Sequence, residues 1–162
     1  ATLFGVWSLF MMGEDKAAWE QLIKALPVTH AHLSATQFVM SNSYSLNPEF
    51  SMDGESMSDW YTGAANVLIK TLVRCVFGVD ATLEGVYIRP AAYMPFASAK
   101  IRIAVRGCSV RVEYVKKGNG KRVFRVGGKF REAPPDPVSG APALLLSEAD
   151  LKGETLVISV ED

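Results

Sequence analysis

The feature that most constrains this 162-residue chain is a change of hydrophobic pattern near residue 80. Before it, the stretch Ser56–Val79 is apolar around most of a helical circumference, with only one narrow polar stripe. After it, apolar and polar residues alternate with a period of two in several short segments. We therefore predict an α+β protein, with a helical segment over residues 1–79 and a β domain over residues 80–162.

The predicted helix Ser56–Val79 has recognisable ends. Ser56 or Ser58 can accept a hydrogen bond from a first-turn amide, and Gly78 can end the helix in a left-handed conformation. A helix this apolar needs partners on several sides. The chain opens on apolar residues without an initiator Met, and we expect the rest of a longer parent chain, or a second copy, to pack against this helix.

Two shorter helices are predicted before it. Phe4–Met12 is an apolar segment stopped by Gly13, and a second helix opens at Glu14 and ends at Pro27. No period holds over residues 28–58, which we predict to be a long polar loop. Such a loop is either functional or a surface connection.

The β half contains five or six short strands separated by turn signals, which predicts an antiparallel, jelly-roll-like β-sandwich. Lys117–Gly120 is typical of a hairpin turn, with the returning strand directly after it. The predicted strands are residues 86–89, 100–106, 109–115, 122–126, 143–146 and 155–160.

Composition sets few limits on partners. Seventeen basic and seventeen acidic residues cancel, so net charge indicates no partner. No apolar run reaches the ~20 residues of a membrane helix and no signal peptide is visible, so we expect a cytoplasmic protein without membrane contact. Cys75 and Cys108 lack metal-ligand spacing and are predicted to be ordinary thiols, as in a reducing compartment.

Residues 100–131 are locally basic. Such a stretch either forms a polyanion-binding face or is the solvated face of alternating strands. No aromatic residue interleaves these cations in the sequence pattern, so nucleic acid is not an expected partner.

His30 and His32 lie two residues apart, a spacing that places two imidazoles on one side of a strand. No third ligand is near in the sequence, so no metal is expected and a structural role is favoured. No nucleophile elbow, phosphate-binding loop or dinucleotide fingerprint is present.

Thr62 and Gly63 lie in the first turn of the predicted long helix, where free amides and the helix dipole attract anions and polarised oxygens. Gly63 would let a ligand approach the backbone, and Trp60 and Tyr61 offer flat faces on which sugars stack. In the alternative interpretation, Gly63 lets two helices touch and Trp60 belongs to the core.

This region resembles the end of the catalytic barrel and the start of the C-terminal β domain in glycoside hydrolase family 94. That family contains cellobiose, chitobiose and β-1,2-glucan phosphorylases and the cyclic β-1,2-glucan synthases. Its pattern is roughly W-x-T-G-S/T-A, a long helix ending in L-G-I/V, and then G-L-x-I-x-P. The matching residues are Trp60, Thr62, Gly63, Ala65, Phe77–Val79 and Gly85–Pro90. Looser, collinear similarity covers most of the chain, including Gly13–Ala31 and Val123–Lys129.

The resemblance implies the last helices of an (α/α)6 barrel followed by the β-sandwich. It implies that Thr62 and Gly63 contact an attacking phosphate or acceptor, with Trp60 and Tyr61 as a sugar wall. The family's general-acid Asp would not lie on this chain, so no catalytic residue is expected here, and inorganic phosphate would be a co-substrate rather than a cofactor. Leu9 and Phe10 stand where the family has a phosphate-contacting His-Asn pair. Either the alignment slips at this point, or this member is not a simple phosphorylase, which leaves transglycosylation, hydrolysis or a lost activity open.

The resemblance thus implies the C-terminal part of a carbohydrate-active enzyme acting on β-linked gluco-oligosaccharides, inactive by itself. The alternative is a non-catalytic β-sandwich module that binds glycan or protein.

Overall fold

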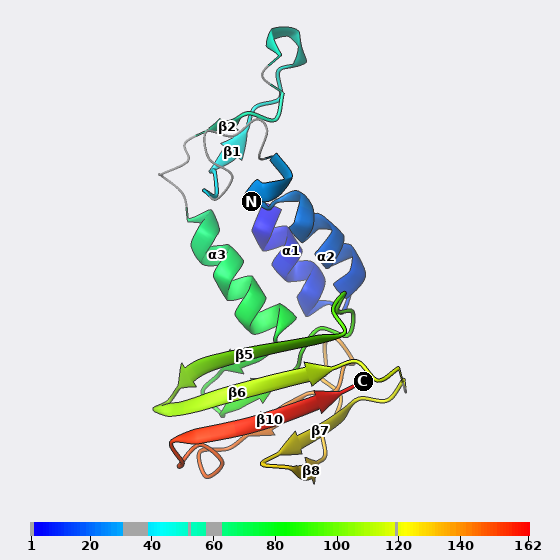
Figure 1. Cartoon of the computed structure of the whole chain (residues 1–162), viewed down its shortest axis with the longest axis vertical. Coiled ribbons are helices and arrows are strands. Elements are labelled where there is room, and N and C mark those ends of the chain that lie inside the picture. The colour runs from blue at the N-terminus through cyan, green and yellow to red at the C-terminus, as the bar shows by residue number, and fades with distance from the viewer. Residues whose placement is uncertain (1, 31–38, 52, 58–62, 119) are drawn as a thin grey trace.

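The computed structural model describes residues 2–30, 39–51, 53–57, 63–118 and 120–162. A layer of helices stands above two β-sheets, and the β1–β2 arm extends from the end of the helices that is remote from the sheets (Figure 1). Helix and sheet are thus both present, which confirms the α+β class. Among the described residues, no helix is long and apolar enough to cross a membrane.

Two antiparallel helices open the chain. Helix α1 spans Thr2–Met11, and α2 spans Asp15–Lys24. Gly13, with φ +82°, takes the left-handed conformation that lets the chain reverse between them. A short 3-10 helix, η1 (Pro27–His30), follows α2, as the proline predicts.

The predicted long helix begins later than expected. Ser56–Met57 forms strand β2, paired antiparallel with β1 (Ser43–Tyr44), so Ser56 is not a helix cap. Helix α3 spans Ala64–Thr71 and continues as a π-helical turn, η3, over Leu72–Val76. The prediction of one helix from residue 56 was wrong because backbone pairing with β1 holds that segment extended. Ser58 lies outside the described residues.

The arm also holds a 3-10 turn, η2 (Pro48–Phe50). The arm falls within the predicted polar loop 28–58, so that loop has some local structure of its own.

The larger sheet has five strands in the order β5-β6-β10-β7-β8. Strand β10 lies between β6 and β7, parallel to β6 and antiparallel to β7, so this sheet is mixed and not purely antiparallel as predicted. The predicted Lys117–Gly120 hairpin is therefore wrong, because β10 separates the two strands that it would join. The strand bounds are β5 Ser98–Val105, β6 Cys108–Val115, β7 Val123–Val126, β8 Lys129–Arg131 and β10 Thr155–Glu161.

The smaller sheet is antiparallel, in the order β3-β4-β9. Its strands are β3 (Val79–Ala81), β4 (Val86–Ile88) and β9 (Leu144–Leu146). Gly78, with φ +68°, separates η3 from β3 and ends the helical segment as predicted.

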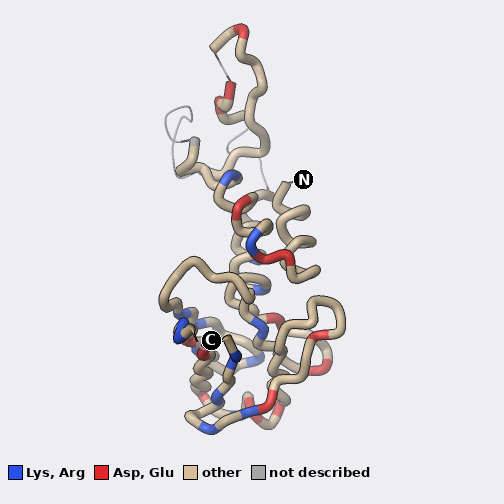
Figure 2. Tube along the Cα trace, turned by 90° about the vertical axis from the view of Figure 1, so that its right-hand side faces the viewer, with Lys and Arg blue, Asp and Glu red and all other residues tan. Residues whose placement is uncertain are grey.

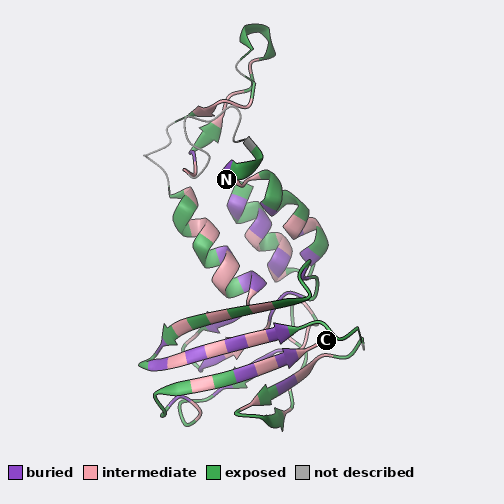
Figure 3. Cartoon of the chain, viewed as in Figure 1, coloured by how far each residue is buried: buried purple, intermediate pink, exposed green. Residues whose placement is uncertain are grey.

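One hydrophobic core joins helices and sheets. It takes inward-facing residues of β6 and β10, residues of β4 and β9, and the buried stripes of α1 and α2. The alternation of buried and half-buried residues along β6 and the second half of β10 is visible in Figure 3. Val110, Val112 and Tyr114 face inward, as their period of two predicts.

Candidate functional site

The first turn of α3 is the site predicted from the sequence. Trp60, Tyr61 and Thr62 lie outside the described residues, whereas Gly63 is the exposed N-cap residue of α3. The Gly63 carbonyl accepts a hydrogen bond from the Val67 amide at 3.1 Å. No described atom beyond its chain neighbours lies within 4 Å of where a Gly63 Cβ would be. The described residues thus give no support to a helix-contact role for Gly63, and its ligand role stays a prediction.

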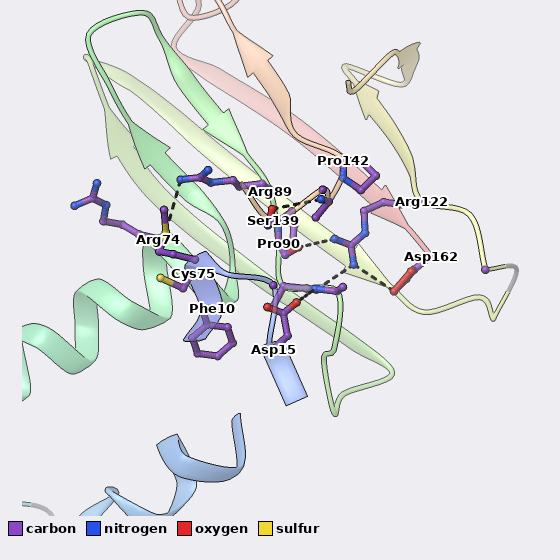
Figure 4. A pocket seen from close by; sticks show the side chains of 17 residues that line it. Phe10, Asp15, Arg74, Cys75, Arg89, Pro90, Arg122, Ser139, Pro142 and Asp162 are labelled. Atoms are coloured by element: carbon purple, nitrogen blue, oxygen red, sulfur yellow. Dashed lines mark hydrogen bonds and ion pairs between the residues drawn. The ribbon is translucent and has the colours of Figure 1, made fainter. Parts of the chain in front are cut away.

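A cavity of about 350 Å³ lies at the other end of the α3–η3 helix, where the helices meet the sheets (Figure 4). At ~1.5 Å per helical residue, Gly63 is roughly 18 Å from the Cys75 side of this cavity. The cavity and the predicted site are therefore separate. The described residues that line it are Phe10, Met11, Gly13, Asp15, Arg74, Cys75, Arg89, Pro90, Ala91, Ala92, Gly120, Arg122, Ser139, Gly140, Ala141, Pro142 and Asp162.

Asp15 is the buried carboxylate of the cavity, only 8% exposed. It lies in the first turn of α2, directly after the reversal at Gly13. Its Oδ2 accepts a hydrogen bond from the Ala92 amide, and the Tyr93 amide lies 3.4 Å from the same oxygen. Burial raises the pKa of Asp15, although these amides and the Arg122 charge oppose the shift. Asp15 thus fastens α2 to the loop that follows β4.

Arg122, the residue before β7, binds the same loop through the loop's backbone carbonyls. Its guanidinium donates to the Pro90 carbonyl and, at 3.0 Å, to the Ala91 carbonyl, and it lies 3.5 Å from an Asp162 carboxylate oxygen. The Tyr114 hydroxyl donates to that carboxylate. Burial and this hydrogen bond raise the pKa of Tyr114 to about 12. Tyr114 is therefore a neutral donor rather than a base.

Two further arginines link η3 to the smaller sheet. Asp80 accepts from Arg74 Nε at 2.7 Å and from Arg89 Nη2 at 3.0 Å, and Arg89 Nη1 donates to Asp136 at 2.7 Å. The Arg74 guanidinium also lies 5.0 Å from the centre of the Trp7 ring. These ion pairs connect η3, β3, the residue after β4 and the loop before β9, and the Arg74–Trp7 contact adds α1.

Asp136 organises that loop. Its Oδ1 accepts hydrogen bonds from the Ser139 amide at 2.9 Å, the Ser139 hydroxyl at 3.0 Å and the Val138 amide at 3.1 Å. Burial alone would raise the pKa of Asp136, but the Ser139 and Val138 hydrogen bonds leave it below its ordinary value. Asp136 is therefore an anionic partner for Arg89.

Cys75 is the one thiol that lines the cavity among the described residues. Burial raises its pKa to about 11, so it stays protonated at neutral pH. A protonated thiol is a poor nucleophile, which excludes Cys75 from thiolate chemistry under those conditions.

The cavity brings together charged groups that already have protein partners. Each carboxylate described above accepts from an arginine or from backbone amides, and no three His, Cys, Asp or Glu side chains among the described residues are close enough to hold a metal ion. His32 lies outside the described residues. The arrangement suits the joining of helices to sheets better than covalent catalysis.

The sequence alone does not identify Asp15 and Arg122 as residues that join the helices to the sheets. Asp15 has a local signal, an acid in a helix's first turn two residues after a glycine. Arg122 lies in the basic stretch and looks like any surface cation there. Its partners are residues about 30 and 40 positions away, so only the tertiary structure identifies it.

Comparison of this chain with family models and with curated proteins yields no significant match. The assignment of function therefore depends on the residues and their geometry.

Proposed function

We propose that this chain is the C-terminal part of a carbohydrate-active enzyme similar to glycoside hydrolase family 94. The parent enzyme would transfer glycosyl groups within, or phosphorolyse, β-linked gluco-oligosaccharides. On this proposal α1, α2 and α3 are the last helices of an (α/α)6 barrel, and the two sheets form the C-terminal jelly-roll-like sandwich. The general acid that protonates the leaving oxygen would lie outside this chain, with the acceptor attacking from the opposite face of the sugar.

The supporting observation is the close approach of backbone atoms to two glycines of the family-like pattern, Gly78 and Gly85. A Cβ on Gly78 would lie 2.1 Å from the carbonyl carbon of Arg89, and one on Gly85 would lie 2.3 Å from the Leu146 carbonyl oxygen. Both glycines belong to the segments that resemble the family, at the end of its long helix and at the start of its first strands. At both of these positions in the family-like pattern, the fold therefore leaves no room for a side chain.

The helical layer also leaves room for further helices. Phe4 on α1 and Ile69 on α3 are 62% and 61% exposed, more than is usual for large apolar residues on a helix that packs on several sides. This supports the proposal that the rest of a parent barrel, or a second copy, covers them.

The position of the family's phosphate-binding pair favours a carbohydrate or water acceptor over phosphate. Phe10 is buried in the core at 6% exposure, and Leu9 packs against that core. Neither side chain offers a hydrogen-bond donor. Thr62 and Gly63 would then hold the acceptor, with Trp60 and Tyr61 as the sugar wall.

Calorimetric titration of the purified chain with β-1,2-, β-1,3- and β-1,4-gluco-oligosaccharides tests the proposal. We expect weak binding that Trp60→Ala and Thr62→Ala reduce about tenfold, because stacking and an acceptor hydrogen bond are lost. Thr2→Ala, a change of the same type at an exposed position, serves as the control. We expect no turnover of any of these substrates.

Two outcomes would contradict the proposal. Turnover by the chain alone would show that it contains a complete active site. Binding that ignores Trp60→Ala and Thr62→Ala but is lost in Tyr87→Ala would instead indicate a non-catalytic β module. Tyr87 is the suitable probe on the sheets because it is half-exposed, whereas Tyr114 is buried and its loss would damage the core.

A further inference from the structure

The outward face of the five-stranded sheet gathers residues that the sequence scatters over sixty positions. Directly paired residues of neighbouring strands lie on the same side of a sheet. The pairings therefore form one cross-strand row, which consists of Lys100, Glu113, Ser159, Arg125 and Phe130.

A second row of the same face is more strongly basic. Arg102 of β5 lies directly opposite Arg111 of β6, and Arg111 opposite Val157 of β10. Like charges directly opposite each other destabilise a sheet unless an anion lies between them. Arg111 forms an ion pair with Glu113, but no carboxylate among the described residues lies within ion-pair distance of Arg102.

The remaining charges leave the face positive. Lys100 and Arg125 likewise have no carboxylate at ion-pair distance among the described residues, and Glu161 on this face is paired with Lys117 at 2.8 Å. Four cations therefore lie among two carboxylates, each of which already has a cationic partner.

Neither the helices nor the smaller sheet covers this face. The inward residues of β6 and β10 pack in the core with β4 and β9. The outward face is turned to the viewer in Figure 1, and Figure 2 shows Lys and Arg more densely over the sheets than over the helices. Between the cations the face carries small side chains such as Ala104, Ser109 and Ser159.

An exposed aromatic side chain lies at the β8 edge of this face, beside Arg125, a position that the sequence pattern did not show. Phe130, 65% exposed, pairs directly with Arg125 through the β7–β8 hairpin. The hairpin turns at Gly127 and Gly128, both with positive φ, and this brings a residue from beyond the alternating segments into the row.

We propose that this face binds single-stranded nucleic acid. Arg102, Arg111 and Arg125, one each on β5, β6 and β7, contact phosphates, and Phe130 on β8 stacks with a base. Cations that follow the backbone, combined with aromatic stacking, are the usual basis of such binding. From β5 to β8 the face spans four strand spacings, about 19 Å, which accommodates three to four nucleotides of an extended strand running across the strands.

Fluorescence polarisation of a labelled twelve-nucleotide oligo(dT) measures this binding. With three phosphate contacts, the logarithm of affinity should fall with the logarithm of salt concentration at a slope near −2, so that affinity drops roughly twentyfold between 50 and 200 mM NaCl. Arg102→Gln should weaken binding several-fold and reduce the slope by ~0.7. Lys129→Gln is the matched control, because Lys129 lies on β8 beside Phe130 but faces the other side of the sheet.

Stacking has its own test. Phe130→Leu keeps an apolar side chain without an aromatic face and should weaken binding about tenfold, whereas Phe130→Trp should preserve or strengthen it. All these substitutions are on exposed side chains, and an unchanged thermal unfolding midpoint confirms that each variant folds.

Three results would overturn the proposal. The first is no binding of oligo(dT) or oligo(U) at 50 mM NaCl and 100 µM protein. The second is an equal effect of Lys129→Gln and Arg102→Gln. The third is competition by heparin together with indifference to Phe130→Leu, which would indicate an anionic-glycan surface instead. None of these measurements depends on Trp60 or Thr62, so the family-94-like proposal succeeds or fails separately.

Discussion

Gly78 occupies a backbone conformation and a space that a side chain does not tolerate. Its φ is +68°, and the peptide that joins Arg89 to Pro90 passes where a Cβ would be. Its carbonyl accepts a hydrogen bond from the Arg89 amide at 2.9 Å. A single residue thus ends the helical segment and lets the first strands of the smaller sheet pack against it.

Gly78→Ala should therefore be strongly destabilising. The positive φ contributes about 1 kcal/mol of strain, and displacement of a backbone segment adds about 1–3 kcal/mol. We expect a loss of about 2–4 kcal/mol in the free energy of unfolding, measured by urea denaturation.

Gly107→Ala separates the two contributions. Gly107 has φ +80° but open space around its Cβ position, so only the strain should appear, about 1 kcal/mol. Equal losses in the two variants would show that the close approach at Gly78 relaxes at no cost.

At the scale of elements, β8 is held by an ion pair to a turn rather than by a second neighbouring strand. Arg131 at the end of β8 donates to both carboxylate oxygens of Asp150, at 2.9 and 3.3 Å. Asp150 also accepts from the amide and hydroxyl of Ser147. The Arg131 hydrogen bonds, together with those of Ser147, lower the pKa of Asp150 to about 2.

Asp150→Asn should destabilise the protein in a pH-dependent way. Because the folded-state pKa lies below the ordinary 3.8, the ionised carboxylate stabilises the fold above that value, and the contribution is lost as pH falls toward 2. Since Arg131 is partly exposed, we expect a loss of only about 1 kcal/mol at pH 7 and almost none near pH 2. Urea denaturation across this range measures it, with Glu148→Gln as the control and a pH-independent loss as the contrary result.

The strands themselves could be predicted from the sequence, but their order could not. The alternation of Ile101, Ile103 and Val105 indicates a strand because period two is a local property. The place of β10 between β6 and β7 depends on pairs 46 residues apart with β6 and 32 to 38 residues apart with β7. The composition of Lys117–Gly120 favours a turn, but a turn does not determine which strand pairs with the one before it.

The prediction of where the long helix starts was wrong for a similar reason. Ser56 is a good helix cap in isolation, but pairing with Tyr44 overrides that preference. The cavity could not be predicted, because Asp15, Arg122 and Asp162 come from three distant parts of the chain and only the tertiary structure brings them together. The Thr62–Gly63 site is still a prediction, since only Gly63 is among the described residues.

At the scale of the whole molecule, Asp15 and Arg122 hold the loop after β4 between helices and sheets. The Ala92 amide donates a hydrogen bond to Asp15, and the Ala91 carbonyl accepts one from Arg122. The helical layer is thus attached to the sheets by polar contacts as well as by the shared core.

Asp15→Ala should loosen this attachment. It leaves the Ala92 amide without its acceptor. Because Ala92 is exposed, water can replace that acceptor, so we expect a loss of about 1 kcal/mol in the free energy of unfolding. Amide hydrogen exchange, read by mass spectrometry, should increase in α2 more than in β6 or β10. Equal acceleration in all three elements would show that the contact contributes only to global stability.

Asp15→Asn tests the charge separately from the hydrogen bond. Because burial holds the pKa of Asp15 above 3.8, the folded protein binds this proton more tightly than the unfolded chain does. The stabilising contribution is therefore complete below pH 3.8 and declines as pH rises through the raised pKa. Relative to the native sequence, Asp15→Asn should gain stability as pH rises through that window, and a constant difference would contradict this.

The position of β10 has a consequence for how the chain reaches its native state. The β5–β6 and β7–β8 hairpins can each form from local contacts, but neither completes the sheet by itself. The bridging strand leaves the ribosome after both, so two unfinished sheet edges persist until it arrives. A high contact order slows that final insertion, and open edges are sites of wrong pairing. We therefore expect the pairing of Thr155–Glu161 between β6 and β7, rather than the formation of the helices, to limit the yield of folded protein.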